Sequence, residues 1–261
     1  MAPDSKWDPE QYRRFAGERS RPFFDLTGRV GAGRPRSVVD LGCGTGALTA
    51  TLAERWPEAQ VEGLDSSAEM IAEAARRTIP GRLHFALGDL REWRPDAALD
   101  VVVSNAALQW VQDHVSLLEG WVEALAPGGW LAFQVPGNDR SPSHVLLDEL
   151  REAPRWRDRL REAAPGPRVL EPAEYLACLT GLGCVVDAWE TTYLHVLRGA
   201  DPVLEWVKGT ALRPVLTTLD PGEQREFLAE YATRLREAYP AQPFGTVLPF
   251  RRLFVVAHLV E

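Results

Sequence analysis

Short apolar runs alternate with stretches of helical spacing between residues 36 and 136. Each run has the length of a buried strand, and several end at a glycine or a polar residue. The predicted strands are 37–42, 61–65, 83–87, 99–106 and 130–135, and the predicted helices are 46–56, 68–77 and 114–125. This alternation predicts βαβ units, and therefore a parallel sheet that is covered by helices on both faces.

The rhythm breaks at residues 137–168, where prolines and arginines crowd and helical spacing is confined to about 144–161. The pattern then resumes with predicted helices at 172–182 and 202–212, a helix that starts at Asp220-Pro221, and strands at 185–196 and 252–260. We expect a single α/β domain whose core is a seven-stranded, mostly parallel sheet. The expected core is about 30–136, 171–199 and 246–261, and the expected helical cap is 1–29, 137–170 and 200–245.

Charge and composition narrow the class of partner and the cellular location. The 261 residues carry a formal net charge of -8, so the average field repels phosphate backbones and a general nucleic-acid binder is disfavoured. No apolar stretch approaches the roughly 18 residues of a membrane helix, and the charged N-terminus does not resemble a signal peptide. Three cysteines without a CxxC pair suit a reducing compartment, and the scattered histidines predict no metal site. We expect a soluble cytoplasmic protein, a monomer or weak oligomer that binds neither membrane nor nucleic acid.

A glycine-rich loop follows the first predicted strand. Asp40 ends that strand, and the loop continues through Gly42, Cys43 and Gly44 toward a predicted helix. Glycines permit a tight turn and close approach of a ligand to the backbone, while the helix N-terminus offers unpaired N–H groups. Asp65 ends the second strand, where a carboxylate can bind ribose hydroxyls. This much fits nicotinamide-dependent enzymes equally well.

Two further acidic residues favour a different ligand. Asp40, directly before the first glycine, would repel a diphosphate but can orient an ammonium group. Asp89, after the third strand, is placed to accept a hydrogen bond from an adenine amino group, although Asp65 and Asp89 would also suit helix caps. A ligand with an amine, a ribose and an adenine but no phosphate is S-adenosylmethionine.

With this set of residues the chain resembles the class I S-adenosylmethionine-dependent methyltransferases. The resemblance implies a Rossmann-like fold and S-adenosyl-L-homocysteine as a product. It also implies cofactor contacts near the ends of the second, third and fourth strands. These contacts would come from Ser66, Met70, Leu90, Asn105 and Ala106 in addition to Asp40, Gly42, Cys43, Gly44, Asp65 and Asp89.

Longer stretches resemble one family within that superfamily, the trans-aconitate methyltransferases. The matching stretches are WDPxxY at 7–12, ERSRP at 18–22, LDSSxxM at 64–70, SNAALQW at 104–110, PSHVL at 142–146, ETTYLH at 190–195, ALRP at 211–214 and FRRLFVVA at 250–257. The resemblance implies transfer of a methyl group to a carboxylate of trans-aconitate, giving a monomethyl ester.

A carboxylate acceptor requires alignment rather than acid–base chemistry. Its pKa of about 4 leaves it ionised at neutral pH, so we expect a positioning mechanism with no catalytic side chain, and no nucleophilic role for Cys43. A polycarboxylate needs arginine and other polar partners. The candidate substrate-binding residues are Arg19, Arg21, Trp110, His144, Tyr193, His195, Arg213 and Arg252.

Two alternatives remain open at this point. The acceptor of a methyltransferase could be another small or carrier-linked carboxylic acid, for which a mostly apolar site with one arginine would suffice. A protein that binds S-adenosylmethionine without catalysis would keep the same three aspartates. Turnover of defined acids distinguishes these alternatives.

Overall fold

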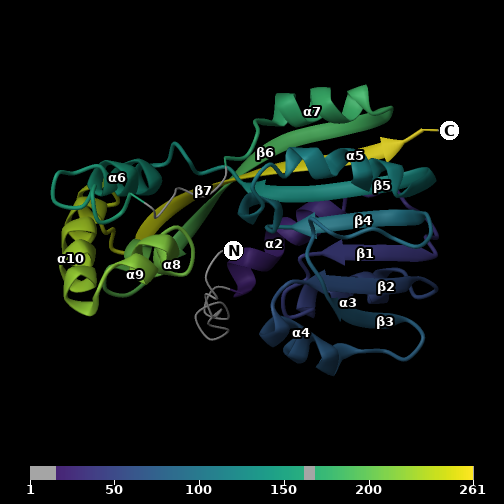
Figure 1. Cartoon of the computed structure of the whole chain (residues 1–261), viewed down its shortest axis with the longest axis horizontal. Coiled ribbons are helices and arrows are strands. Elements are labelled where there is room, and N and C mark those ends of the chain that lie inside the picture. The colour runs from purple at the N-terminus through teal and green to yellow at the C-terminus, as the bar shows by residue number, and fades with distance from the viewer. Residues whose placement is uncertain (1–15, 162–167, 261) are drawn as a thin grey trace. The chain divides into compact units, whose positions relative to one another are not determined.

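The computed structural model describes residues 16–161 and 168–260 (Figure 1). Its strands are β1 Ser37–Leu41, β2 Gln60–Asp65, β3 Leu83–Leu87, β4 Leu99–Asn105, β5 Leu125–Pro136, β6 Cys184–Leu197 and β7 Thr246–Leu259. They form one sheet in the order β3-β2-β1-β4-β5-β7-β6. The pairs β1–β2, β1–β4, β2–β3 and β4–β5 are parallel, and β7 is antiparallel to β5. The predicted seven-stranded, mostly parallel sheet is therefore confirmed.

Helices connect most of these strands. The helices are α2 Ala16–Thr27, α3 Ala47–Arg55, α4 Ala68–Ala74, α5 Val115–Glu123, α6 Pro142–Arg151, α7 Pro172–Gly181, α8 Pro202–Lys208, α9 Arg213–Thr218 and α10 Pro221–Ala238, with short 3-10 turns η1 Ala75–Arg77 and η2 Leu108–Trp110. The predicted βαβ units are present, because α3, α4 and α5 each lie between two consecutive strands of the parallel part of the sheet.

Several predicted boundaries are wrong, each for a local reason. The helix expected over 144–161 ends at Arg151, shortly before Pro154, which disfavours helical geometry in the residue that precedes it. The region 202–212 contains only α8, which ends at Gly209, and a separate helix begins at Arg213. β5 starts at Leu125 rather than 130, because Leu125 pairs with Leu99 before the ladder is interrupted by a register shift.

The chain divides into two compact units. The sheet unit contains Gly17–Pro136, Val169–Thr191 and Arg252–Glu261, and the helical unit contains Gly137–Arg168 and Thr192–Arg251. The predicted division into core and cap follows a similar pattern, except that α2 was expected in the cap and belongs almost entirely to the sheet unit.

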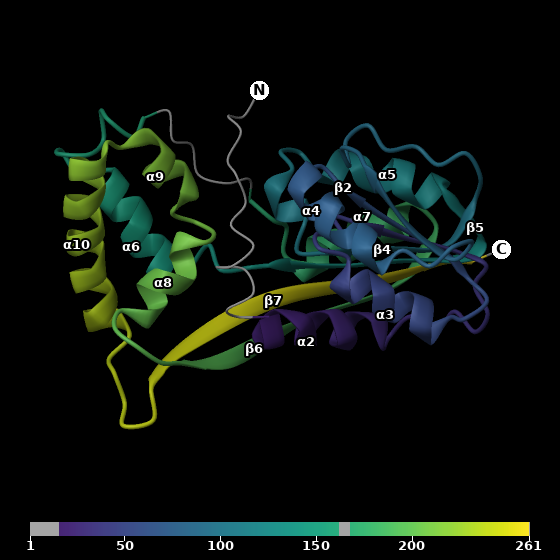
Figure 2. The same cartoon turned by 90° about the horizontal axis from the view of Figure 1, so that it is seen from below.

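The sheet unit has a hydrophobic core on each side of its strands. Residues Leu118 and Trp121 of α5 and Tyr175 of α7 are buried in one cluster with Val102 and Phe133 of the central strands. Helices α2 and α3 lie on the opposite side of the sheet (Figure 2). Both faces are thus covered, which is the arrangement that a parallel sheet requires.

The helical unit has its own core, formed by apolar residues of α6, α8, α9 and α10. Hydrogen bonds join α6 to α10: the Tyr231 hydroxyl donates to the main-chain oxygen of Ser143 at 2.6 Å, and the Ser143 N–H donates to the Tyr239 hydroxyl at 3.0 Å. As predicted, Asp220 is the N-cap of α10, and its carboxylate accepts from the N–H groups of Gly222 and Glu223.

Candidate active site

Polar side chains line one face of the sheet where the parallel strands end. The strand register pairs Asp40 with Val103, Asn105 with Gln134, and Pro136 with Arg252. Paired residues in neighbouring strands share a face, and so do residues two apart in one strand. Asp40, Asn105, Gln134 and Arg252 therefore project from the same face, across β1, β4, β5 and β7. The arrowheads of β1 and β4 mark this carboxyl edge in Figure 1.

The glycine loop turns tightly at this edge. Gly42 has a φ of 86°, and a Cβ atom there would lie 2.3 Å from the Cβ of Ala107, so the position requires glycine. Gly44 has a φ of 55°, but no described atom lies within 4 Å of the position of its Cβ. One side of the loop is therefore packed against the segment after β4, and the other side is open to a ligand.

Asp65 holds the loop from the neighbouring strand. Its Oδ2 accepts a hydrogen bond from the Gly44 N–H at 2.9 Å, and its Oδ1 accepts from the Ser67 N–H at 2.9 Å. A carboxylate has about four acceptor sites, so these two bonds leave capacity for a ligand hydroxyl. Ser67 in turn caps α4, because its hydroxyl accepts from the Met70 N–H. The sequence analysis missed Ser67, although a serine before an apolar helix is an ordinary N-cap signal.

Asp40 is a buried carboxyl group with an unused acceptor. Its Oδ2 accepts from the Thr49 hydroxyl of α3 at 2.6 Å, while its Oδ1 has no partner among the described residues. Burial raises the pKa of Asp40 to about 7, the Thr49 hydrogen bond opposes that shift, and the charge of Asp65 adds to it. An acid in this state suits a positively charged donor, which would satisfy the orphaned oxygen and favour its ionised form.

We predict that Asp40→Asn changes how stability depends on pH. Unfolded, Asp40 ionises near pH 3.8, whereas the folded chain keeps the proton until about pH 7. The wild-type free energy of unfolding therefore falls as pH rises through this window, and asparagine removes that contribution. The advantage of the variant over wild type should grow by roughly 2–3 kcal/mol between pH 5 and pH 8, measured by urea unfolding. A difference that stays constant over this range would show that Asp40 is already ionised in the folded protein at pH 5.

Asp89 is engaged in a local ion pair. Its two carboxylate oxygens accept from the guanidinium of Arg91, with the Arg91 Nε 3.0 Å from each, and Oδ1 also accepts from the Arg91 N–H. The hydrogen bond from the Arg91 side chain is the main cause of the lowered pKa of Asp89. Asp89 is thus fixed as an ionised acceptor after β3. Its turn-capping bond is the alternative role considered from the sequence, and its contact with an adenine stays a prediction.

The remaining predicted cofactor residues differ in exposure. Met70 and Leu90 are buried, Ser66 is exposed, and Ala106 has a positive φ of 55° directly after β4. The Cys43 thiol is buried and has a raised pKa, mainly because of burial and next because of the charge of Asp40. It stays protonated at neutral pH, which argues against a nucleophilic role.

Three side chains form a polar chain at the ends of β4, β5 and β7. The Arg252 Nη1 donates to the Gln134 Oε1 at 3.2 Å, and the Gln134 Nε2 donates to the Asn105 Oδ1 at 2.8 Å. Arg252 is 5% exposed and Gln134 is fully buried. The sequence analysis identified Arg252 and Asn105 but missed Gln134, whose signal is a polar residue inside the apolar run of β5.

Three other candidates lie in the N-terminal half of the sheet unit. Arg21 of α2 is largely exposed and lies 3.7 Å from the carboxylate of Asp25. Trp110 ends η2 and is 45% exposed. The side chain of Arg19 lies outside the described residues. The structure does not bring Arg21 or Trp110 into the polar chain of Arg252, and their contact with a substrate stays a prediction.

The helical unit contains the other four candidates. His195 stacks on Trp206 with ring centroids 4.9 Å apart and on Tyr193 at 6.3 Å, so these residues form one buried aromatic cluster. His144 lies beside Ser141, with the Nδ1 3.0 Å from the hydroxyl oxygen, and burial lowers its pKa. Arg213 begins α9, and burial lowers its pKa also. Substrate roles for these four residues stay predictions.

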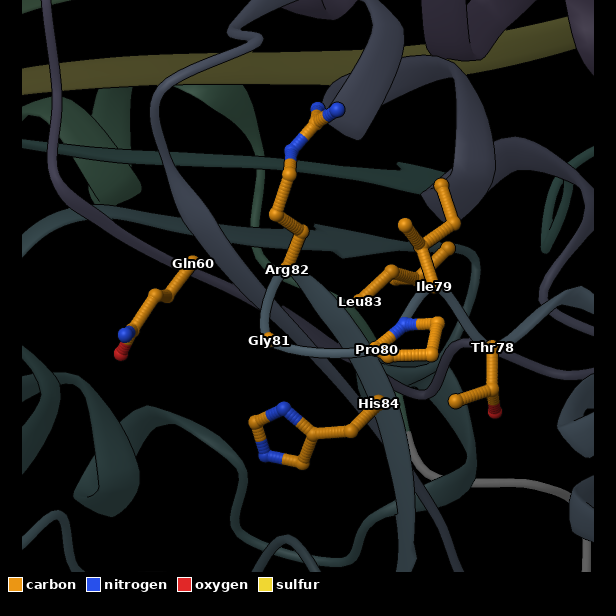
Figure 3. Close-up of a pocket in the computed structure, with 8 residues that line it drawn as sticks. All are labelled: Gln60, Thr78, Ile79, Pro80, Gly81, Arg82, Leu83 and His84. Atoms are coloured by element: carbon orange, nitrogen blue, oxygen red, sulfur yellow. The ribbon is translucent and has the colours of Figure 1, made fainter.

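A separate hollow of about 230 Å³ lies at the opposite end of β2 and β3 (Figure 3). Its lining comes from Gln60 at the start of β2, the turn 78–82, and Leu83 and His84 at the start of β3. The Arg82 side chain points away from His84, and its Nη2 donates to the main-chain oxygen of Ala53 at 2.5 Å. Because parallel strands start here and end at the glycine loop, this hollow is distinct from the site at the carboxyl edge.

Within the described ranges, no cluster of three or more His, Cys, Asp or Glu side chains is arranged to hold a metal ion. None of the helices described there is both long enough and apolar enough to cross a membrane.

Known proteins are similar to this chain at two levels. A family model described as a methyltransferase domain matches residues 38–129, which contain the glycine loop and the ends of β1 to β4. A trans-aconitate 2-methyltransferase of Streptomyces avermitilis is 55% identical over 259 residues, covering 97% of this chain and 96% of the relative. A protein of the same name from Mycobacterium sp. strain KMS is 53% identical over 254 residues, covering 96% and 98%.

A solved structure is similar in fold alone. It is geranyl diphosphate C-methyltransferase from Streptomyces coelicolor A3(2), in complex with Mg²⁺, geranyl diphosphate and S-adenosyl-L-homocysteine. The TM-score is 0.57 at 16% sequence identity, and the alignment covers 100% of this chain and 86% of that one.

Proposed function

The chain belongs to the trans-aconitate 2-methyltransferase family, and on that premise we propose that it methylates a carboxylate of trans-aconitate. The observation that carries this proposal is the high identity to relatives of that name over almost the whole chain. The likeness extends through the helical unit as well as the glycine loop, so it is not limited to the part that binds a cofactor.

The carboxyl edge fits S-adenosylmethionine as the cofactor. The unpartnered Oδ1 of Asp40 suits its ammonium group, the spare acceptor capacity of Asp65 suits its ribose hydroxyls, and the open side of Gly44 leaves room beside the backbone. These three residues belong to consecutive segments of one unit, and none of them requires a phosphate group on the ligand. We assign Asp40, Gly44 and Asp65 to cofactor binding on this basis.

The chemistry requires alignment and little else from the protein. When bound, S-adenosylmethionine supplies a methyl group on a sulfonium, and the transfer to a carboxylate oxygen leaves S-adenosylhomocysteine and a monomethyl ester. Because the acceptor is ionised at neutral pH, no side chain has to remove a proton from it. The side chains bind, orient and exclude water, and alignment of this kind contributes several kcal/mol to catalysis, up to about 7–11.

Arg252 is the side chain that we assign to the substrate carboxylates. Its guanidinium is nearly buried, and it shares a sheet face with Asp40 and Asn105. Its acceptor Gln134 is neutral, so the hydrogen bond between them does not cancel the positive charge. A buried guanidinium binds carboxylates strongly, through paired hydrogen bonds and weak screening. This cation favours a polycarboxylate over an apolar, long-chain acid.

Some expectations from the sequence stay predictions. They are the cytoplasmic location, the state of a monomer or weak oligomer, and the absence of nucleic-acid binding, which the net charge of -8 supports. The substrate contacts of Arg19, Arg21, Trp110, His144, Tyr193, His195 and Arg213 also belong here.

The test of the proposed function is a comparison of acceptors. Purified protein and S-adenosylmethionine are offered trans-aconitate, cis-aconitate, citrate, isocitrate and a fatty acid in parallel, and esters are quantified by mass spectrometry. We expect the monomethyl ester of trans-aconitate to form fastest. Faster esterification of the fatty acid would replace the acceptor, and cofactor binding without any ester would favour a non-catalytic role.

A further inference from the structure

Gln134 is a fully buried polar residue that joins the ends of three strands. Its side-chain amide contacts Arg252 of β7 on one side and Asn105 of β4 on the other. Its main-chain oxygen accepts from the Ala106 N–H at 2.9 Å, so the turn after β4 is attached to the same residue. A buried glutamine in the middle of a sheet needs partners for both ends of its amide, and these two neighbours supply them.

The chemistry of the three groups fixes the direction of every hydrogen bond in the chain. A guanidinium has donors and no acceptor, so Gln134 must turn its oxygen toward Arg252. Its NH₂ group then faces Asn105, which must present its own oxygen in return. The N–H groups of Asn105 are therefore directed away from Gln134 and are left for another partner. The positive charge of Arg252 thus sets the orientation of an amide two strands away.

From this geometry we infer that Gln134 is a positioning residue for anion recognition, which orients Arg252 and Asn105 so that both present N–H donors to a substrate carboxylate. The inference rests on the proposed function and deepens it, because it states how one residue outside direct contact selects a carboxylate acceptor. A donor array attracts the ionised oxygen atoms of a polycarboxylate and offers nothing to an apolar acid.

A change of polarity at position 134 distinguishes this role from simple packing. Glutamate keeps the shape of the side chain and the hydrogen bond from Arg252, but its charge cancels that of the guanidinium. Its oxygen atoms also require Asn105 to rotate and present donors to them, which turns the Asn105 oxygen outward. Methionine at this position removes both hydrogen bonds and leaves the charge of Arg252 intact. If Gln134 served only to stabilise the sheet, Gln134→Glu would be milder than Gln134→Met.

The experiment measures binding and turnover together. Trans-aconitate is titrated by calorimetry into protein saturated with S-adenosylhomocysteine, and ester formation is followed by mass spectrometry. We expect Gln134→Glu to weaken trans-aconitate binding by about 30-fold or more and Gln134→Met by about 5-fold. The matched control Gln60→Glu adds the same charge at an exposed position on β2 and should leave the affinity unchanged. Equal or better binding by Gln134→Glu than by Gln134→Met overturns the inference.

A second variant covers the case in which Gln134→Glu does not fold. Asn105→Asp keeps the oxygen that accepts from Gln134 and replaces the outward N–H donors with an acceptor. We expect it to lose trans-aconitate affinity to a similar degree, with a thermal unfolding midpoint close to wild type. Unchanged affinity in a folded Asn105→Asp would also overturn the inference.

The outcomes separate this inference from the proposed function. If wild type binds trans-aconitate but forms no ester, the proposed function is wrong, and the affinities of the variants still decide the role of Gln134. If wild type forms the ester and the variants bind like wild type, only the role of Gln134 is wrong. If wild type neither binds nor esterifies trans-aconitate, both are wrong.

Discussion

Asp65→Ala is expected to weaken the binding of S-adenosylhomocysteine by about 100-fold or more. The substitution removes the acceptor of the Gly44 and Ser67 N–H groups as well as the proposed contact with the ribose. Hydrogen bonds to a charged group contribute about 1.5–3 kcal/mol each, so the loss of ligand contacts together with a loosened loop reaches this factor. Isothermal titration of the purified variant measures it.

The control for this variant is Glu62→Ala. Glu62 lies in the same strand on the other face, where its carboxylate is 3.4 Å from His84. It removes one negative charge from β2 without touching the glycine loop, so the affinity should remain that of wild type. Binding by Asp65→Ala within 3-fold of wild type would mean that the cofactor lies elsewhere.

Arg252→Met is expected to reduce kcat/KM for trans-aconitate by about 100- to 1,000-fold. A desolvated charge pair that loses one partner costs about 2–5 kcal/mol, and here the partner is the carboxylate of the substrate. Methionine keeps an unbranched side chain of similar length, so the apolar contacts of β7 are largely retained. The cofactor affinity should change little, because the glycine loop and Asp65 are three and four strands away from β7 in the sheet. Steady-state kinetics with each substrate varied in turn separate the two effects.

Arg29→Met is the matched control for charge. Arg29 is exposed and lies 3.4 Å from the carboxylate of Asp187, in the same unit. Its loss changes the net charge by the same amount and should leave kcat/KM unchanged. An Arg252→Met variant with nearly unchanged kcat/KM would assign the carboxylates to other residues, and a large fall with both fatty acid and trans-aconitate would indicate a structural defect.

The parallel sheet was predictable because its signals are local and repeated. Each strand of the half before residue 137 is a compact apolar run that ends at a turn residue, and the structure places β3 at the predicted residues 83–87. Helix caps were equally readable, since Asp220 with Pro221 determines the start of α10 through contacts within four residues. Periodicity and capping chemistry are sufficient for elements of this kind.

Elements that depend on a distant partner were not predictable in the same way. Residues 125–129 join β5 because Leu125 pairs with Leu99, and the sequence carries no local sign of that pairing. The helix after Ser141 was expected to continue past Arg151, because the arginine-rich run 155–161 has helical spacing that Pro154 overrides.

The site shows the same division. Asp40, Gly42 and Asp65 are recognisable from their positions after strands, but the hydrogen bonds that define their state come from Thr49, Ser67 and the segment after β4. Gln134 illustrates the limit most clearly. Its polarity inside an apolar strand is visible in the sequence, yet its meaning depends on the register that places Asn105 and Arg252 beside it.

The most direct test of the account is the identity of the product made from labelled cofactor. Purified protein is incubated with trans-aconitate and S-adenosylmethionine that carries ¹³C in its methyl group, and the mixture is analysed by NMR. The account predicts one labelled ester methyl signal, coupled to a single carboxyl carbon of trans-aconitate, together with an equal amount of S-adenosylhomocysteine. A labelled methyl group on any atom other than a carboxylate oxygen, or no transfer to trans-aconitate at all, would contradict it.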